Sequence, residues 1–173
     1  MPRFGSHRIV APNVYMEVEG LDFEDFEVGQ VFEHRPGRTL TALENTLHAL
    51  RSLDLSARHV DRHYAERMHG GESTIGETFV LGVVTAMTTK TFGKVVANLG
   101  WKDVTFPRPL RPGDTIYAES EILGKRESRS RPTQGIMHVR TRGLDQHGQD
   151  VCAFTRDFLV YKRGQGPYVD AGY

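Results

Sequence analysis

Two side chains that can exchange protons lie five positions apart in the first half of the chain. Asp54 is followed by His59, with Ser56 and Arg58 between them. A carboxylate and an imidazole that meet at one water molecule can move a proton in either direction near neutral pH. Adding water to a double bond beside a carbonyl, or removing it, requires this proton transfer. Asp54 and His59 are therefore candidates for a catalytic pair, and the alternative is a polar residue at a helix end followed by a loop histidine.

A helix before this pair is indicated by its start signal and by its apolar spacing. Thr41 and Glu44 fit a capping box, in which a hydroxyl and a carboxylate satisfy backbone N–H groups at a helix start. Leu43, Leu47 and Leu50 then recur at spacings of four and three, which places them on one face of a helix. The pattern predicts a helix that runs to about residue 52.

The pair itself is expected just outside this helix. Asp54 follows its end, and His59 is predicted in the loop after it. A second short helix is expected from about Asp61, and His69-Gly70-Gly71 reads as a flexible break.

An apolar segment at 79–87 follows a second possible capping box, Thr74 to Glu77. The segment is apolar on every side, which is typical of a helix wrapped by other structure. Its β-branched valines also suit a strand, but the start signal and the length favour a helix.

From residue 95 the apolar period changes to two, which predicts strands. A turn is expected at 111–114, where Pro112 and Gly113 occupy the positions that a type II turn prefers. Helices followed by a run of meandering strands indicate the α+β class. The predicted strands are 31–35, ended by Pro36-Gly37, then 95–99, 104–106, 115–123, 135–142 and 151–161, with a hairpin loop at 145–148.

The composition excludes several classes of protein. The 22 basic and 22 acidic side chains cancel, so no overall field attracts nucleic acid or an acidic membrane. Cys152 is the only cysteine, which excludes an internal disulfide and suits a cytoplasmic location. No secretory signal or membrane-spanning apolar run is expected. At 173 residues the chain is predicted to be one domain with a surface arm and a tail.

Over roughly residues 22–163 the chain resembles the MaoC-like hydratase/dehydratase family. The family signature is a helix followed by Asp-x-Asn-Pro-Leu-His, then an acidic residue and Tyr-Ala; Asp54, His59, Asp61, Tyr64 and Ala65 keep that spacing. Segments 26–30, 97–101 and 111–115 fit as well. The last two, with 128–132, are most similar to the branch of mesaconyl-CoA hydratases and methylmalyl-CoA dehydratases.

The resemblance implies a hotdog fold, in which a long, curved antiparallel sheet wraps one buried helix, here over residues 21–163 between an arm (1–20) and a tail (164–173). It also implies reversible hydration of an α,β-unsaturated acyl-CoA by Asp54 and His59. Gly76, at the start of the buried helix, matches the family's oxyanion glycine. Ser56 replaces the Asn that positions substrate or water, and Arg58 replaces Leu.

Substrate binding is expected from further residues. Arg58 suits a free carboxylate on a mesaconyl-like acyl group, and Tyr64 follows the signature. The basic segment 125–131, with Arg129 and Arg131, is either a solvated hairpin loop or a clamp for coenzyme A phosphates. No cofactor is expected beyond the coenzyme A of the substrate. Single-domain relatives imply at least a homodimer, so an isolated copy should expose apolar surface.

Three other functions fit parts of the sequence. His59 and His63 have a spacing that lets two imidazoles bind zinc, although no cysteine lies nearby. Glu77, on the apolar helix, is the carboxylate that a hotdog thioesterase would use. The altered residues between Asp54 and His59 also suit an acyl-CoA-binding module without activity.

Overall fold

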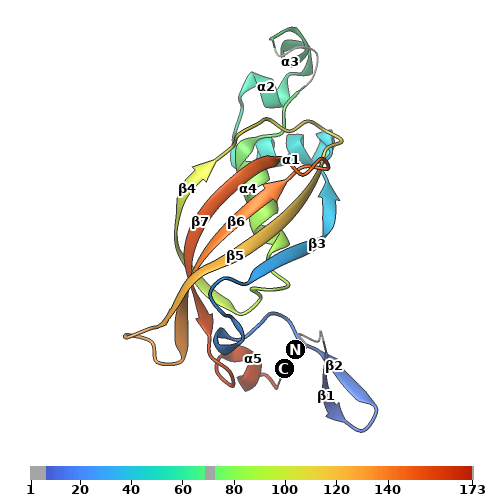
Figure 1. Cartoon of the computed structure of the whole chain (residues 1–173). Helices are drawn as coiled ribbons and strands as arrows, with labels where there is room; N and C mark the ends of the chain where they lie inside the picture. Colours follow the sequence, from blue (N-terminus) through green and yellow to red (C-terminus); the bar gives the residue numbers. More distant parts are fainter. Residues whose placement is uncertain (1–6, 69–72, 173) are drawn as a thin grey trace.

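A five-stranded antiparallel sheet curves around one long helix, α4 (Figure 1). The computed structural model describes residues 7–68 and 73–172. The strand order is β3-β5-β6-β7-β4, so β3 and β4 are the two edges. This arrangement confirms the α+β class and the wrapped helix. The sheet strands are β3 (Val31–Thr39), β4 (Val95–Thr105), β5 (Thr115–Glu127), β6 (Gln134–Leu144) and β7 (Asp150–Tyr161).

The helices lie at both ends of the sheet and along its inner face (Figure 1). They are α1 (Ala42–Ser52), α2 (Ala57–Val60), α3 (Arg62–Met68), α4 (Glu77–Met87), α5 (Pro167–Asp170) and the 3-10 helix η1 (Phe23–Asp25). None of the helices in the described ranges is long and apolar enough to span a membrane. The flexible break expected at 69–71 lies outside the described residues.

Buried and exposed side chains alternate along the strands and so define the inner face of the sheet, which packs on α4. Met137 and Val139 of β6 are fully buried, whereas Ile136, His138 and Arg140 point to the other face and are partly or fully exposed. Met137 and Val139 belong to a separate buried cluster away from α4. The sheet residues that meet the helix form a cluster of their own. It comprises Val80, Val83 and Val84 of α4 with Ile116, Ala118, Val151, Cys152 and Phe154 of the sheet.

The strand from Val31 does not end at Pro36-Gly37, as the sequence predicted. β3 continues to Thr39, and its pairing with β5 shifts register between His34 and Arg38. A Cβ atom on Gly37 would lie 2.5 Å from the Tyr117 ring. The glycine therefore lets Tyr117 of the neighbouring strand pack close, and the strand bulges here instead of ending.

The arm and tail contain structure that periodicity did not reveal. β1 (His7–Ala11) and β2 (Val14–Glu17) form a hairpin that projects from the body (Figure 1). The tail carries α5. Both elements are too short for a repeating pattern to identify them.

α4 is a helix as expected, but the sequence misplaced its start and overestimated its burial. Gly76, not Thr74, is the N-cap residue, so the second capping box is absent. The exposed residues Thr78, Gly82 and Ala86 recur every four positions. One side of α4 is thus open in the single chain, because the sheet covers only the other side.

The C-terminal end of α4 lies over a buried arginine. Arg156 of β7 donates to Oγ1 of Thr88, the C-cap residue, at 2.8 Å, and its guanidinium lies over the Phe92 and Phe158 rings. Burial lowers the pKa of Arg156 to about 10. A positive charge here faces the negative end of the helix dipole.

Candidate active site

Asp54 is positioned by the end of α1. The capping box predicted at Thr41 and Glu44 is confirmed. At the other end, Leu53 adopts the left-handed conformation with φ 58°, and the N–H groups of Leu53 and Asp54 both donate to the Ala49 carbonyl. This cap turns the chain out of the helix axis and places Asp54 directly beyond it.

His59 lies in a helix and not in a loop, which corrects the sequence interpretation. α2 is a single turn, and the His59 N–H donates to the Ser56 carbonyl at 2.9 Å. A four-residue helix is too short to show periodicity, so nothing in the sequence announced it. α3 follows as expected, with the Asp61 carboxylate accepting from the Tyr64 N–H.

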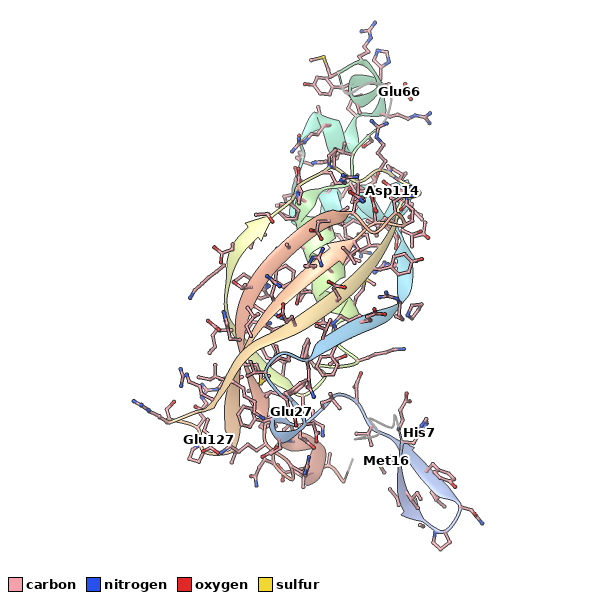
Figure 2. The ribbon with its side chains drawn as sticks, in the orientation of Figure 1. His7, Met16, Glu27, Glu66, Asp114 and Glu127 are labelled. Atoms are coloured by element: carbon pink, nitrogen blue, oxygen red, sulfur yellow. The ribbon has the colours of Figure 1, made fainter. Side chains whose placement is uncertain are left out.

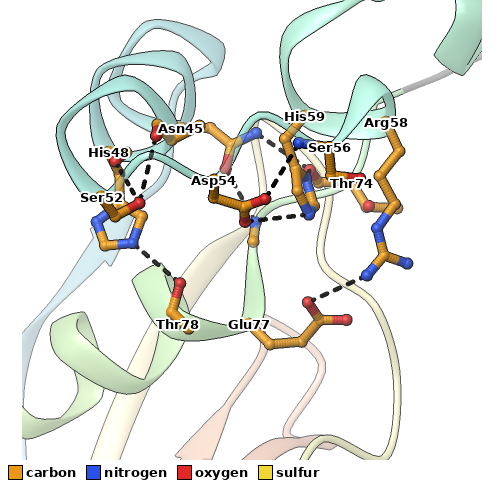
Figure 3. A network of polar contacts seen from close by, with 12 residues as sticks. Asn45, His48, Ser52, Asp54, Ser56, Arg58, His59, Thr74, Glu77 and Thr78 are labelled. Atoms are coloured by element: carbon orange, nitrogen blue, oxygen red, sulfur yellow. Dashed lines mark hydrogen bonds and ion pairs between the residues drawn. The ribbon is translucent and has the colours of Figure 1, made fainter.

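The two predicted catalytic side chains face each other (Figure 3). His59 Nε2 lies 3.9 Å from Asp54 Oδ2; the imidazole is 3% exposed and the carboxylate 37%. His59 Nδ1 lies 3.2 Å from the Thr74 carbonyl oxygen. A carbonyl only accepts, so Nδ1 carries a proton, and in the neutral imidazole Nε2 is the nitrogen with the free lone pair. One water at about 2.8 Å from each group bridges such a gap.

Gly76 lies against this pair. An ideal Cβ on Gly76 would be 3.9 Å from His59 Nε2, so the missing side chain leaves space beside the base. The Gly76 N–H donates to Asn45 Oδ1 at 2.9 Å and is therefore already engaged. The N–H groups of Glu77 and Thr78, in the first turn of α4, have no acceptor within the helix.

Asn45 is a site residue that the sequence did not reveal. It lies on α1 and is 2% exposed, whereas the leucines predicted to share one apolar face of this helix are exposed: Leu43 is 68% exposed, Leu47 39% and Leu50 52%. The inward face of α1 is therefore made by Asn45 and Ala49. The apolar period pointed to the leucine face of α1, because a period does not distinguish a helix face that the same chain covers from one that it leaves exposed.

An ion pair lies at the edge of the site. Arg58 Nη2 is 3.6 Å from Glu77 Oε2, and both side chains are nearly half exposed. Ser56 contributes its backbone N–H, which donates to Asp54 Oδ1 at 3.3 Å. Arg58 thus lies within the site region with its charge directed toward α4 (Figure 3).

The remaining predicted residues lie farther away. Tyr64 is on α3 and 42% exposed. Arg129 and Arg131 lie in the turn between β5 and β6. Figure 2 shows Glu127, the last residue of β5, at the end of the sheet opposite Glu66 of α3, so this turn is remote from the pair within one chain.

The zinc arrangement is not formed as the spacing suggested. His59 belongs to α2 and His63 to α3, with Asp61 as a break between the two helices. The two imidazoles therefore do not share one helix face. Among the described residues, no group of three or more His, Cys, Asp or Glu side chains gathers in a way that could hold a metal ion.

Comparison with known proteins places the chain in a family. The profile of the family described as mesaconyl-CoA hydratase matches residues 11–172. The chain belongs to this family. A mesaconyl-CoA hydratase of Cereibacter sphaeroides is 34% identical over 149 residues, which cover 83% of this chain and 42% of the relative.

Solved structures agree on the hotdog fold. A putative MaoC domain dehydratase from Chloroflexus aurantiacus superposes with a TM-score of 0.74 at 28% identity, covering 86% of this chain and 42% of that one. A Mycobacterium tuberculosis protein described as a double hotdog fold has a TM-score of 0.73 at 25% identity, covering 86% and 46%. This family member thus spans less than half the length of these relatives.

Proposed function

We propose that this protein reversibly hydrates an α,β-unsaturated acyl-CoA thioester. The observation that carries the proposal is the 3.9 Å gap between His59 Nε2 and Asp54 Oδ2, with Nδ1 held by the Thr74 carbonyl. One basic nitrogen and one carboxylate oxygen then share a water, as hydration requires. The names of the hydratase and dehydratase relatives support this class of reaction.

The proposed step balances within the site. His59 Nε2 takes a proton from the water while the water oxygen bonds to the β-carbon and the double-bond electrons move to the thioester oxygen as an enolate. Asp54 orients the water and stabilises the imidazolium. Nε2 then returns the proton to the α-carbon, and the enolate collapses. No electrons leave the substrate, so we propose that no cofactor is needed beyond its coenzyme A.

The enolate oxygen needs donors beside Gly76. Because the Gly76 N–H already donates to Asn45, we propose that the N–H groups of Glu77 and Thr78 supply them, with Gly76 providing the space. The helix dipole adds a partial positive charge at this position. Removing a donor of this kind typically lowers the rate about 100-fold or more.

A short branched or dicarboxylic acyl group is the proposed substrate. The mesaconyl-CoA hydratase relatives support this choice. Arg58 lies at the edge of the site, and among the described residues its charge is paired only with the partly exposed Glu77, at 3.6 Å. A substrate carboxylate can therefore replace Glu77 as its partner.

Thioester hydrolysis by Glu77 is the competing proposal. Its support is the position of Glu77 at the first residue of α4, but its carboxylate is paired with Arg58. Release of free thiol from acyl-CoA, abolished by Glu77→Gln, would favour hydrolysis over hydration.

We further propose that two copies of the chain pair through the edge strand β4. The open side of α4 and the exposed leucines of α1 leave the site without one wall. A two-fold axis that pairs β4 with β4 in antiparallel fashion inverts the second copy. Arg129 and Arg131 of the partner subunit would then approach the end that carries this chain's pair, where they suit the coenzyme A phosphates.

The decisive experiment follows loss of the enoyl-thioester absorbance of crotonyl-CoA and mesaconyl-CoA. Asp54→Asn and His59→Ala should each lower kcat by about 100-fold or more. Asp61→Asn and His63→Ala are matched controls, because they change the same residue types within the neighbouring segment and should leave kcat within about threefold. Hydration that survives both site substitutions would remove the proposed mechanism.

A further inference from the structure

A buried amide connects α1 to the start of α4. Asn45 is 2% exposed, and burying a primary amide is costly unless its polar atoms are bonded. Its Oδ1 accepts from the Gly76 N–H at 2.9 Å, and its Nδ2 donates to the Thr74 carbonyl at 3.1 Å. The opposite orientation of the amide would oppose donor to donor and acceptor to acceptor. Both bonds therefore fix the side chain in one orientation.

The Thr74 carbonyl joins Asn45 to the catalytic base. This oxygen accepts from Asn45 Nδ2 at 3.1 Å and from His59 Nδ1 at 3.2 Å, so both of its lone pairs are used. The N–H of the same peptide, on Ile75, donates to the Leu110 carbonyl at 2.8 Å. The peptide is thus held from both sides. Within the described residues, the Thr74 carbonyl accepts from two side chains, the His59 imidazole that it orients and the Asn45 amide.

The second bond of Asn45 acts on the oxyanion side of the site. Because Oδ1 engages the Gly76 N–H, that donor cannot turn toward a substrate oxygen. The bond also fixes the distance between His59 and the first turn of α4, since Gly76 lies directly against the imidazole. One side chain therefore bridges the segment that orients the base and the segment that presents the backbone donors.

We infer that Asn45 is a positioning residue for the reaction. It holds His59 as the Nδ1-protonated tautomer, which leaves Nε2 free to accept a proton from water, and it directs the oxyanion to the N–H groups of Glu77 and Thr78. The inference rests on the proposed function for its catalytic consequence. The tautomer of His59 is a separate readout that does not depend on activity.

The test compares Asn45→Leu, which keeps the number of side-chain heavy atoms and removes both bonds, with the unchanged protein. With crotonyl-CoA, kcat should fall about 100-fold, the effect of misplacing a reacting group by about 1 Å, while KM changes less than about threefold. Nitrogen NMR of the imidazoles should show the Nδ1-protonated signal of His59, assigned by its loss in His59→Ala, giving way to a mixture of tautomers. Thr141→Val is the matched control, because Thr141 is also buried and hydrogen-bonded, to Ser120, but lies in β6.

The outcomes separate the two proposals. If Asn45→Leu retains both the tautomer and a kcat within about threefold, the positioning role is wrong. If the unchanged protein hydrates no enoyl-CoA but the tautomer still depends on Asn45, the proposed function fails while the positioning of His59 stands. Should Asn45→Leu not fold, Asn45→Asp is measured in the same way, since its carboxylate still accepts from the Gly76 N–H but cannot donate to Thr74. Loss of activity in Thr141→Val to the same extent would reduce Asn45 to a structural role.

Discussion

At the scale of single residues, one methyl group added to Gly76 tests the space beside the base. The backbone there has φ −63° and ψ 134°, which any residue adopts, and a Cβ would make only ordinary contacts at 3.7 to 3.9 Å. Gly76→Ala should therefore fold, with a free energy of unfolding within about 1 kcal/mol of the original. The methyl group would occupy space beside Nε2, so kcat/KM should fall by about tenfold or more.

The control for this prediction is Gly124→Ala, which also introduces one ordinary contact, at 3.8 Å from His138, but lies on the outer face of the sheet. It should leave kcat/KM unchanged. Thermal unfolding and steady-state hydration of crotonyl-CoA measure the two effects. Full activity in Gly76→Ala would show that the reacting water binds elsewhere.

A buried histidine far from the site makes stability depend on pH. Burial, and then the charges of Arg156 and Arg35, lower the pKa of His34 from 6.5 to about 4. The unfolded chain therefore binds the proton more readily between those values, and stability is lost as the pH falls from about 6.5 to 4. The shift corresponds to about 3 kcal/mol, an upper limit for this one group.

Urea unfolding at pH 7 and pH 4.5 measures this effect. In the unchanged protein the free energy of unfolding should fall over this range, and in His34→Gln it should fall distinctly less. Gln retains hydrogen-bonding groups that can reach the hydroxyls of Ser120 and Thr91, which now contact the two ring nitrogens. Identical slopes for the two proteins would mean that His34 does not titrate in this range.

At the scale of elements, the backbone at the end of α1 is strained directly before Asp54, the proposed catalytic carboxylate. Leu53 has φ 58° and is 79% exposed, so its side chain gains little from burial while its backbone adopts a conformation that costs about 1 kcal/mol for a non-glycine residue. Leu53→Gly should therefore raise the free energy of unfolding by up to about 1 kcal/mol. Leu50→Gly, within the same helix, should lower it by about the same amount. A loss of stability in Leu53→Gly would show that the leucine packs against something outside the single chain.

The elements also show which parts of the architecture can be predicted from the sequence. α1 was predicted correctly because its capping box is a local signal, and the alternation of β6 was predicted because apolar character and burial agree along that strand. α2 and the start of α4 were not, because a one-turn helix has no period and Gly76 caps α4 without a side-chain signal. The proximity of Asp54 and His59 followed from the spacing that they share with the family signature. Asn45 did not, because its role depends on a peptide 29 residues away.

At the scale of the whole molecule, exposed apolar side chains lie on the edge strand β4, through which we propose that two copies pair. β4 is an 11-residue edge strand with Leu99 52% exposed and Trp101 41% exposed. A long, apolar edge is normally paired or covered. The relatives contain more than twice the matched length, and one is described as a double hotdog fold. We propose that a second copy of the chain covers this edge.

The proposed pairing predicts that substitutions that prevent dimer assembly also remove the hydratase activity. Light scattering should give a mass of about 39 kDa, twice the 19.5 kDa of one chain. The double substitution Leu99→Glu with Trp101→Glu places like charges across the two-fold axis and should yield a monomer with an unchanged circular dichroism spectrum. Because the open side of α4 then faces water, hydration should fall by about 100-fold, as expected when reacting groups lose their dry, shaped site. Ile9→Glu, which charges an apolar residue of the projecting hairpin that is 72% exposed, should change neither mass nor rate. A monomeric double variant with full activity would place the complete site within one chain.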